Sequence, residues 1–154
     1  MCPTDREYGK LCRQSLVKDL HESWGELTFE GSWLKSTKTN NRILTLYSDL
    51  HNNHWFFGIQ EDYWKNWNND SYLVFIMRDN IFCSYVLLTP EESSILLEKI
   101  NWASDKSKKI YIRIPSTGKM YIQQWPQFPC QDRIINIGSI NPKESLSEMI
   151  EDAL

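Results

Sequence analysis

The chain shows two hydrophobic periods, and each period indicates one kind of secondary structure. Residues Asp5–Trp24 have the helical period, with an apolar stripe that consists of Tyr8, Cys12, Leu16, Leu20 and Trp24. The cations that lie off this stripe are Arg6, Lys10, Arg13 and Lys18. We therefore expect an amphipathic helix that ends near Gly25. Its charged face is either solvated or in contact with a phosphate backbone.

The segment from residue 54 to residue 100 has the most regular pattern of the chain. His54–Gln60 is an aromatic and aliphatic run typical of a half-buried strand. Glu61–Trp67 begins with two acids, which favour the positive end of a helix dipole. Ser71–Met77 is almost continuously apolar, so we expect a strand that is covered on both faces. Ile81–Leu88 follows a polar turn and is predicted to pair with that strand as a hairpin.

The residues that follow this hairpin predict the start of a helix. Thr89 is a good N-cap, Pro90 fits the first helical position, and Glu92 is placed to complete a capping box. The helix is expected to continue towards Ile100.

Shorter patterns before this segment predict additional strands. Glu26–Leu34 alternates apolar and polar residues across Gly31, which we interpret as a bulge. Arg42–Ser48 is predicted to be a strand, and Asp49–Asn53 a hairpin loop that leads into the strand at His54.

The last third of the chain adds strands and a helix. Ile110–Ile114 and Lys119–Trp125 are predicted to form a hairpin, and Ile134–Ile137 a short last strand. A C-terminal helix is predicted after Asn141, with an apolar stripe formed by Leu146, Met149, Ile150, Ala153 and Leu154. The order of elements predicts an α+β fold. We expect one domain over residues 1–154, with a mixed, mainly antiparallel sheet of six to seven strands and N-terminal, central and C-terminal helices.

Composition narrows the class of protein. Of the 154 residues, 41% are hydrophobic and 24% are charged, values that argue against wholesale disorder. The 17 Lys and Arg residues against 20 Asp and Glu residues leave a net charge of −3. This balance argues against a generic polyanion binder, but it allows a basic face on an acidic body.

The cysteines and the hydropathy bear on the compartment. Cys2, Cys12, Cys83 and Cys130 form no C-x-x-C pair, and the position of Cys83 within an apolar strand predicts a buried free thiol. The N-terminal residues are polar and charged, and the longest apolar run is too short to span a membrane. We therefore expect a cytoplasmic protein with reduced thiols and no membrane partner.

The aromatic stretch after residue 60 is a candidate binding surface. On a helix, Tyr63 and Trp67 share a face, and Trp64 lies three residues before Trp67. Aromatic side chains provide a large contact area and can stack on bases. The alternative is that these rings cover the edge of the sheet as part of the core.

Basic residues cluster at two predicted turns. Lys35, Lys38 and Arg42 surround the first turn, and the second group contains Lys108 and Lys109, with Lys106 and Arg113 nearby. If the two turns lie on one edge, they form a positive patch suited to a nucleic-acid backbone. Scattered solubilising lysines are the alternative interpretation.

The sequence assigns no catalytic residue, metal ligand or cofactor. His51 and His54 have a spacing compatible with a metal, but a zinc site needs two additional ligands, and no second spaced pair is visible. Asp49 and His51 form a conceivable acid–base pair of low specificity.

The order of an N-terminal helix, three meandering strands, a helix and the apolar strand Ser71–Met77 resembles the core of the PD-(D/E)xK nucleases. The likeness spans residues 11–100, and it implies a metal-dependent site built from two acids and a lysine. Lys35 is positioned to supply the lysine, whereas Trp33 and Leu34 stand where an acid is required and no intact E-x-K is present. A small open barrel of the B3 DNA-binding type is a second resemblance.

Three hypotheses follow. The first is a non-catalytic binding module of a nucleic-acid-processing or defence-type complex, which contacts DNA, RNA or a protein partner through the aromatic stretch and the basic turns. The second is a divergent PD-(D/E)xK-like nuclease that uses Glu22, Glu30 and Lys35. The third is a protein-interaction subunit that binds a larger complex through Leu146, Met149 and Ile150.

Overall fold

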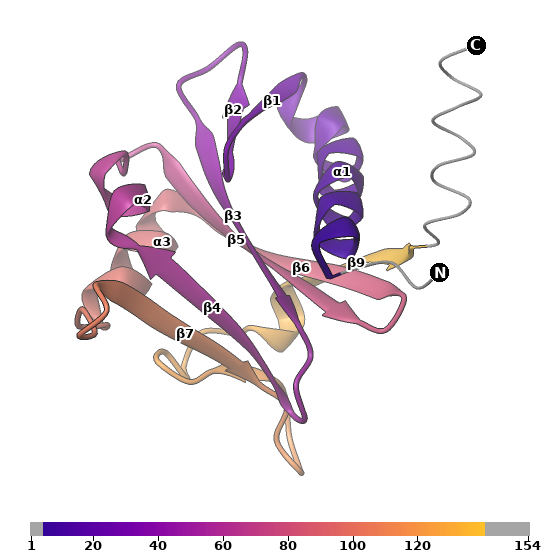
Figure 1. Ribbon diagram of the computed structural model, residues 1–154, viewed down its shortest axis with the longest axis vertical. Helices are drawn as coiled ribbons and strands as arrows, with labels where there is room; N and C mark the ends of the chain where they lie inside the picture. Colours follow the sequence, from indigo (N-terminus) through magenta and orange to yellow (C-terminus); the bar gives the residue numbers. More distant parts are fainter. Residues whose placement is uncertain (1–4, 141–154) are drawn as a thin grey trace.

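The computed structural model describes residues 5–140 of the chain, and the predicted α+β class is confirmed. Within these residues there are three α-helices, one 3-10 helix and nine strands (Figure 1). The helices are α1 (Asp5–Trp24), α2 (Glu61–Lys65), α3 (Pro90–Glu98) and the 3-10 helix η1 (Gln131–Arg133). The predicted C-terminal helix lies outside the described residues.

The predicted mixed, mainly antiparallel sheet is present with six strands, and three additional strands form a second sheet. The larger sheet has the order β1-β2-β3-β5-β6-β9, in which only the β3–β5 pair is parallel. Its strands are β1 (Leu27–Glu30), β2 (Trp33–Ser36), β3 (Arg42–Asp49), β5 (Ser71–Asp79), β6 (Phe82–Leu88) and β9 (Ile134–Ser139). The smaller, antiparallel sheet consists of β4 (His54–Gln60), β7 (Ser107–Arg113) and β8 (Tyr121–Ile122).

The larger sheet separates two hydrophobic cores, which explains the apolar character of β5. Leu73, Phe75 and Met77 point into the core shared with the smaller sheet and α3. Val74 and Ile76 point to the other face, which is covered by the apolar stripe of α1. The side chains of these five residues are at most 1% exposed, as expected for a strand that is covered on both faces.

The local signals for the two longer helices are confirmed. α1 has the predicted bounds, and the N–H of Gly25, which has φ +72°, donates to the carbonyl of His21 at 2.9 Å. At α3, Thr89 Oγ1 accepts from the N–H of Glu92 at 3.2 Å, and the Glu92 carboxylate accepts from the N–H of Thr89 at 3.1 Å. Both contacts of the predicted capping box are therefore present.

The interpretation of Gly31 as a bulge is wrong. Glu30 and Trp33 are paired directly, and Gly31 and Ser32 form the two-residue turn of a β1–β2 hairpin. Gly31 has φ +62°, which glycine adopts without steric cost. The alternation of apolar and polar residues continues through the turn, so the sequence does not reveal that the chain reverses direction there.

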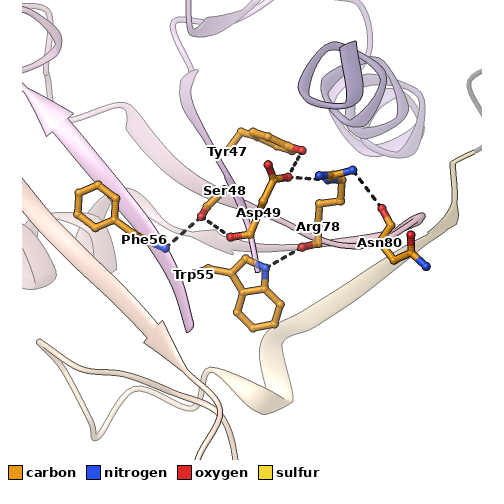
Figure 2. Close-up of polar contacts among 7 residues, drawn as sticks. All are labelled: Tyr47, Ser48, Asp49, Trp55, Phe56, Arg78 and Asn80. Atoms are coloured by element: carbon orange, nitrogen blue, oxygen red, sulfur yellow. Dashed lines mark hydrogen bonds and ion pairs between the residues drawn. The ribbon is translucent and has the colours of Figure 1, made fainter. Parts of the chain in front are cut away.

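The predicted turn between β3 and β4 is present, but the two strands diverge into different sheets. His51 and His54 exchange backbone hydrogen bonds at 2.9 and 3.0 Å around the turn. Beyond the turn, Ser48 Oγ accepts from the backbone N–H of Phe56 at 3.0 Å (Figure 2). A hydroxyl therefore replaces a strand carbonyl at the point of divergence.

An ion pair in the larger sheet lies beside this divergence. The Nε of Arg78 donates to Asp49 Oδ1 at 2.5 Å, and the hydroxyl of Tyr47 donates to the same oxygen (Figure 2). The indole N–H of Trp55, from the smaller sheet, donates to the carbonyl of Arg78 at 3.0 Å. These contacts tie β3, β4 and β5 together at one end.

Among residues 5–140, no helix combines the length and apolar character that crossing a membrane requires.

Candidate functional site

The three predicted aromatic residues are half-buried and contact the core between the two sheets. The rings of Trp64 and Trp67 are stacked, with centroids 5.8 Å apart and planes inclined by 12°. The hydroxyl of Tyr63 lies 3.2 Å from Ser32 Oγ in the β1–β2 turn. These side chains therefore pack α2 against the larger sheet, and only their exposed parts are free to contact a ligand.

The stacked pair continues into β2 and β3. The centroids of the Trp67 and Trp33 rings are 5.8 Å apart, and the guanidinium carbon of Arg42 lies 4.2 Å from the centre of the Trp33 ring. No hydrogen bond joins the Arg42 guanidinium to another residue within the range 5–140, and its Nε is buried without a partner. Trp33 is almost wholly buried, so stacking holds Arg42 against a rigid surface.

Arg42 lines a pocket of about 350 Å³ between the β2–β3 turn and the loop from α2 to β5. The two loops are joined by a hydrogen bond from the N–H of Arg42 to the carbonyl of Asp70 at 3.2 Å. The pocket walls are polar and consist of Lys35, Ser36, Thr39, Asn40, Asn41, Arg42, Asn68 and Asp70. We call this the turn pocket.

The charge of the turn pocket is locally positive. Lys35 and Arg42 contribute two cations, and Asp70 is the one acid in the lining. Lys35 also forms an ion pair with Glu30 at 2.5 Å, and its hydrogen bond and charge hold the pKa of that carboxyl below its ordinary value. Lys38 is exposed in the same turn. The structure therefore brings together the first group of predicted cations.

The second group of predicted cations is divided between two faces of β7. Lys108 is 7% exposed, and its Nζ donates to the carbonyl of Leu97 near the end of α3 at 2.7 Å. Burial lowers the pKa of the Lys108 amine. Lys109 points to the other face and pairs with Asp105 at 3.4 Å. In this conformation, the Lys108 amine forms a hydrogen bond inside the protein and is not available to a phosphate.

Sequence reasoning missed Trp102, the exposed member of the aromatic group. Its ring is 41% exposed and contacts Trp64 edge-on, with centroids 6.0 Å apart. The Nζ of Lys108 lies 4.9 Å from the Trp64 ring and 5.0 Å from the Trp102 ring. A large apolar residue in an otherwise polar connection was the available signal.

A second hollow lies between the first half of α1 and the β1–β2 turn. Its volume is about 820 Å³, and it is lined by Arg6, Glu7, Lys10, Arg13, Gln14, Phe29 and Gly31. Arg13 is held in place by a 3.3 Å hydrogen bond from its Nε to Thr45 Oγ1. Three of the cations that lie off the apolar stripe of α1 therefore face one groove.

The residues of the nuclease hypothesis are only partly brought together. Glu30 and Lys35 pair across the β1–β2 hairpin, and Glu22 is exposed in the last turns of α1. Within the described part of the chain, no three His, Cys, Asp or Glu side chains are grouped as metal ligands would be. His51 is exposed in its turn, and His54 lies beside Tyr111, with ring centroids 5.7 Å apart.

Comparison of the chain with known proteins finds no matching family model, no significantly similar curated protein and no significantly similar solved structure.

Proposed function

We propose that this chain is a non-catalytic nucleic-acid-binding module of a nucleic-acid-processing or defence-type complex, and that the turn pocket contacts phosphate. The observation that carries this proposal is Arg42, which lines the pocket and whose guanidinium stacks on Trp33 with no hydrogen-bond acceptor among the described residues. Of the Arg42 guanidinium nitrogens, Nε is buried without a partner. Since buried polar groups are normally hydrogen-bonded, a guanidinium that the described residues leave unsatisfied favours an acceptor supplied from outside the chain.

The chemistry of the pocket favours an oxyanion. A guanidinium presents a planar fork of donors that matches a phosphate, and the Trp33 ring fixes its plane in advance. Lys35 adds a second positive charge, and Asn40, Asn41 and Asn68 add amide donors that can also reach a sugar or a base edge. A volume of about 350 Å³ suits one nucleotide-sized group rather than a helix of nucleic acid.

Because the net charge of the chain is −3, phosphate binding requires a local cluster of cations. A polyanion gains affinity when its phosphates meet clustered cations, because bound counterions are then released. The turn pocket and the groove lined by Arg6, Lys10 and Arg13 are two such clusters. They lie at opposite ends of β2, beside the β2–β3 turn and the β1–β2 turn respectively.

The resemblance to the PD-(D/E)xK core rests on a helix, three meandering strands, a helix and an apolar strand. The structure contains α1, α2 and the apolar strand β5 in that order, but it divides the first of the three strands into β1 and β2 and places the third, β4, in the smaller sheet. The resemblance remains a proposal, as does catalysis by Glu22, Glu30 and Lys35. The protein-interaction hypothesis depends on Leu146, Met149 and Ile150, which lie outside the described residues.

The proposal is tested by binding of a labelled oligonucleotide to variants of single cations at several salt concentrations. Arg42→Gln and Lys35→Gln should weaken binding and reduce the slope of log K against log salt by about 0.7 to 0.9 for each lost phosphate contact. Lys18→Gln removes the same charge from an exposed position on α1 outside both hollows, and it should change neither quantity. Equal effects of all three substitutions would show that only net charge matters.

A further inference from the structure

The outer face of the smaller sheet carries two aromatic rings in the middle of a solvent-exposed surface. Along β4 and β7, the side chains of Trp55, Phe57, Ile110 and Ile112 point into the core. Alternation places Phe56 and Tyr111 on the opposite face. Phe56 is 38% exposed, although a strand position facing solvent usually carries a polar side chain. In Figure 1 these strands lie side by side, away from α1.

The two rings form one platform. Phe56 and Tyr111 are directly opposite in the β4–β7 register, and their ring centroids are 5.2 Å apart. Gly58, the next residue on this face, has no side chain to occupy the adjoining space. A Cβ at Gly58 would lie 3.6 Å from Cζ of Phe56, so the Phe56 ring extends over this glycine. The Phe56 and Tyr111 rings are inclined to each other by 47°, and the missing side chain of Gly58 leaves the space beside Phe56 open.

Cations border the platform on both sides. The guanidinium carbon of Arg113 lies 5.1 Å from the centre of the Tyr111 ring, and its Nε donates to the amide oxygen of Gln123. Lys109 is opposite Gly58 in the register, at the other end of the platform, and among residues 5–140 it forms an ion pair only with Asp105. His54 is paired with Arg113 and borders the same side. The platform is therefore complementary to a chain of negative charges.

Phe56 is exposed and Tyr111 is half-buried, and such rings on a sheet face, with cations beside them, are suited to unpaired nucleobases. Each base offers a π-face to the rings, while the flanking cations follow the phosphates. A duplex keeps its bases stacked on one another and cannot offer these faces. The same rings would contribute little to binding a duplex backbone.

We propose that Phe56 and Tyr111 stack on the bases of single-stranded nucleic acid, with Arg113 and Lys109 contacting its phosphates. This inference rests on the proposed function, because it names the form of nucleic acid that the chain binds and adds a second contact surface. The turn pocket supplies phosphate contacts, and this sheet face, which we call the aromatic face, supplies the preference for unpaired bases.

The test compares the wild-type protein on oligo(dT), on the same oligonucleotide with every base removed, and on duplex DNA. We expect the dissociation constant for the abasic strand to be at least about 5-fold higher than for oligo(dT), because this strand loses the stacks on both rings and one base–aromatic stack contributes about 5- to 150-fold. Phe56→Leu, which removes one of the two stacks, should weaken oligo(dT) binding by about 5- to 150-fold and leave abasic binding unchanged. Phe82→Leu is the matched control, because Phe82 is 59% exposed on the larger sheet.

The outcomes separate the two proposals. Equal affinity for oligo(dT) and the abasic strand would overturn base stacking, even if Phe56→Leu failed to fold. Binding that Arg42→Gln weakens and Phe56→Leu does not would also overturn it, while leaving the proposed function in place. Absence of binding to every oligonucleotide at low salt would overturn both.

Discussion

The guanidinium carbon of Arg42 lies 4.2 Å above the ring of Trp33, and this stack is the point where the turn pocket meets the core. Removing the stack should have a small cost in stability, because cation–π contacts near the surface contribute about 0.5 to 1 kcal/mol. We expect Arg42→Gln to lower the free energy of unfolding by that amount in urea titrations. Lys35→Gln removes a cation from the same pocket but no ring contact, and it should leave the urea midpoint almost unchanged. A larger loss for Lys35→Gln than for Arg42→Gln would contradict this account.

The tryptophans of the α2 region should behave as structural side chains. Trp64 and Trp67 contact each other, Trp33 and Trp102, and both pack against the core. Replacing a fully buried tryptophan by alanine typically costs 3 to 5 kcal/mol, so we expect Trp67→Ala to cost about 2 kcal/mol at this half-buried site. Trp102→Ala is the comparison, because its ring is 41% exposed and should cost clearly less.

A Trp64→Ala/Trp67→Ala double substitution removes both stacked rings at once. The double variant should unfold at markedly lower urea concentration than the wild type. Unchanged unfolding would instead assign both rings to a surface that is free for a partner.

Glu92, in the first turn of α3, gives the protein a defined acid sensitivity. Hydrogen bonds from Arg133, at 2.7 and 2.8 Å, are the main reason that the pKa of Glu92 lies below its ordinary value of 4.5. The folded state therefore favours the ionised carboxylate. The resulting stability is present above pH 4.5 and is lost as the pH falls through the lower folded-state pKa.

The matched variants for this effect are Glu92→Gln and Glu91→Gln, which remove one charge each from the first turn of α3. We expect Glu92→Gln to lower the free energy of unfolding by about 1.5 to 3 kcal/mol at neutral pH, the range for hydrogen bonds to charged groups. The difference from wild type should shrink below pH 4.5. Glu91→Gln, at an exposed position, should follow the wild-type profile. Similar acid profiles for wild type and Glu92→Gln would contradict the assignment.

The three described thiols should be unreactive in the folded protein. Cys12, Cys83 and Cys130 are free and buried, which confirms the prediction made for Cys83. The pKa of Cys12 is raised mainly by a hydrogen bond with Cys83 and, to a smaller extent, by burial. Burial alone raises the pKa of Cys130 to about 12. Since the thiolate is the reactive form, iodoacetamide at neutral pH should label these positions only after denaturation, as mapped by peptide mass spectrometry. Rapid labelling of Cys12 in the native protein would show that α1 opens readily.

Elements with strong local signals were predictable from the sequence. The stripe of α1, the capping box of α3 and the doubly buried strand β5 each depend on residues close together in the chain. The errors arose where local pattern is ambiguous. An alternating pattern continues through the two-residue turn at Gly31, and the short loop after β3 does not reveal that β4 pairs with β7, more than forty residues later.

In the candidate sites, too, groupings of residues close in the sequence were predictable and contacts between distant segments were not. Lys35, Lys38 and Arg42 lie close together in the sequence around one turn, so their grouping was predictable. The stack of Arg42 on Trp33 depends on the register between β2 and β3, and the Phe56–Tyr111 pair depends on a contact between distant strands. Lys108 and Lys109 are adjacent, yet strand alternation sends one inward and the other outward. None of these relations is visible in the sequence of one segment.

Nucleic-acid binding by this chain is tested first by a salt-titrated binding assay of the wild-type protein with single- and double-stranded DNA and RNA, with and without Mg²⁺. We expect binding at low salt that weakens steeply as salt rises, as phosphate contacts require, with tighter binding to single strands and no cleavage products. Absence of binding to all four nucleic acids at low salt would contradict the claim. Metal-dependent cleavage that Lys35→Ala abolishes would replace it with the nuclease hypothesis.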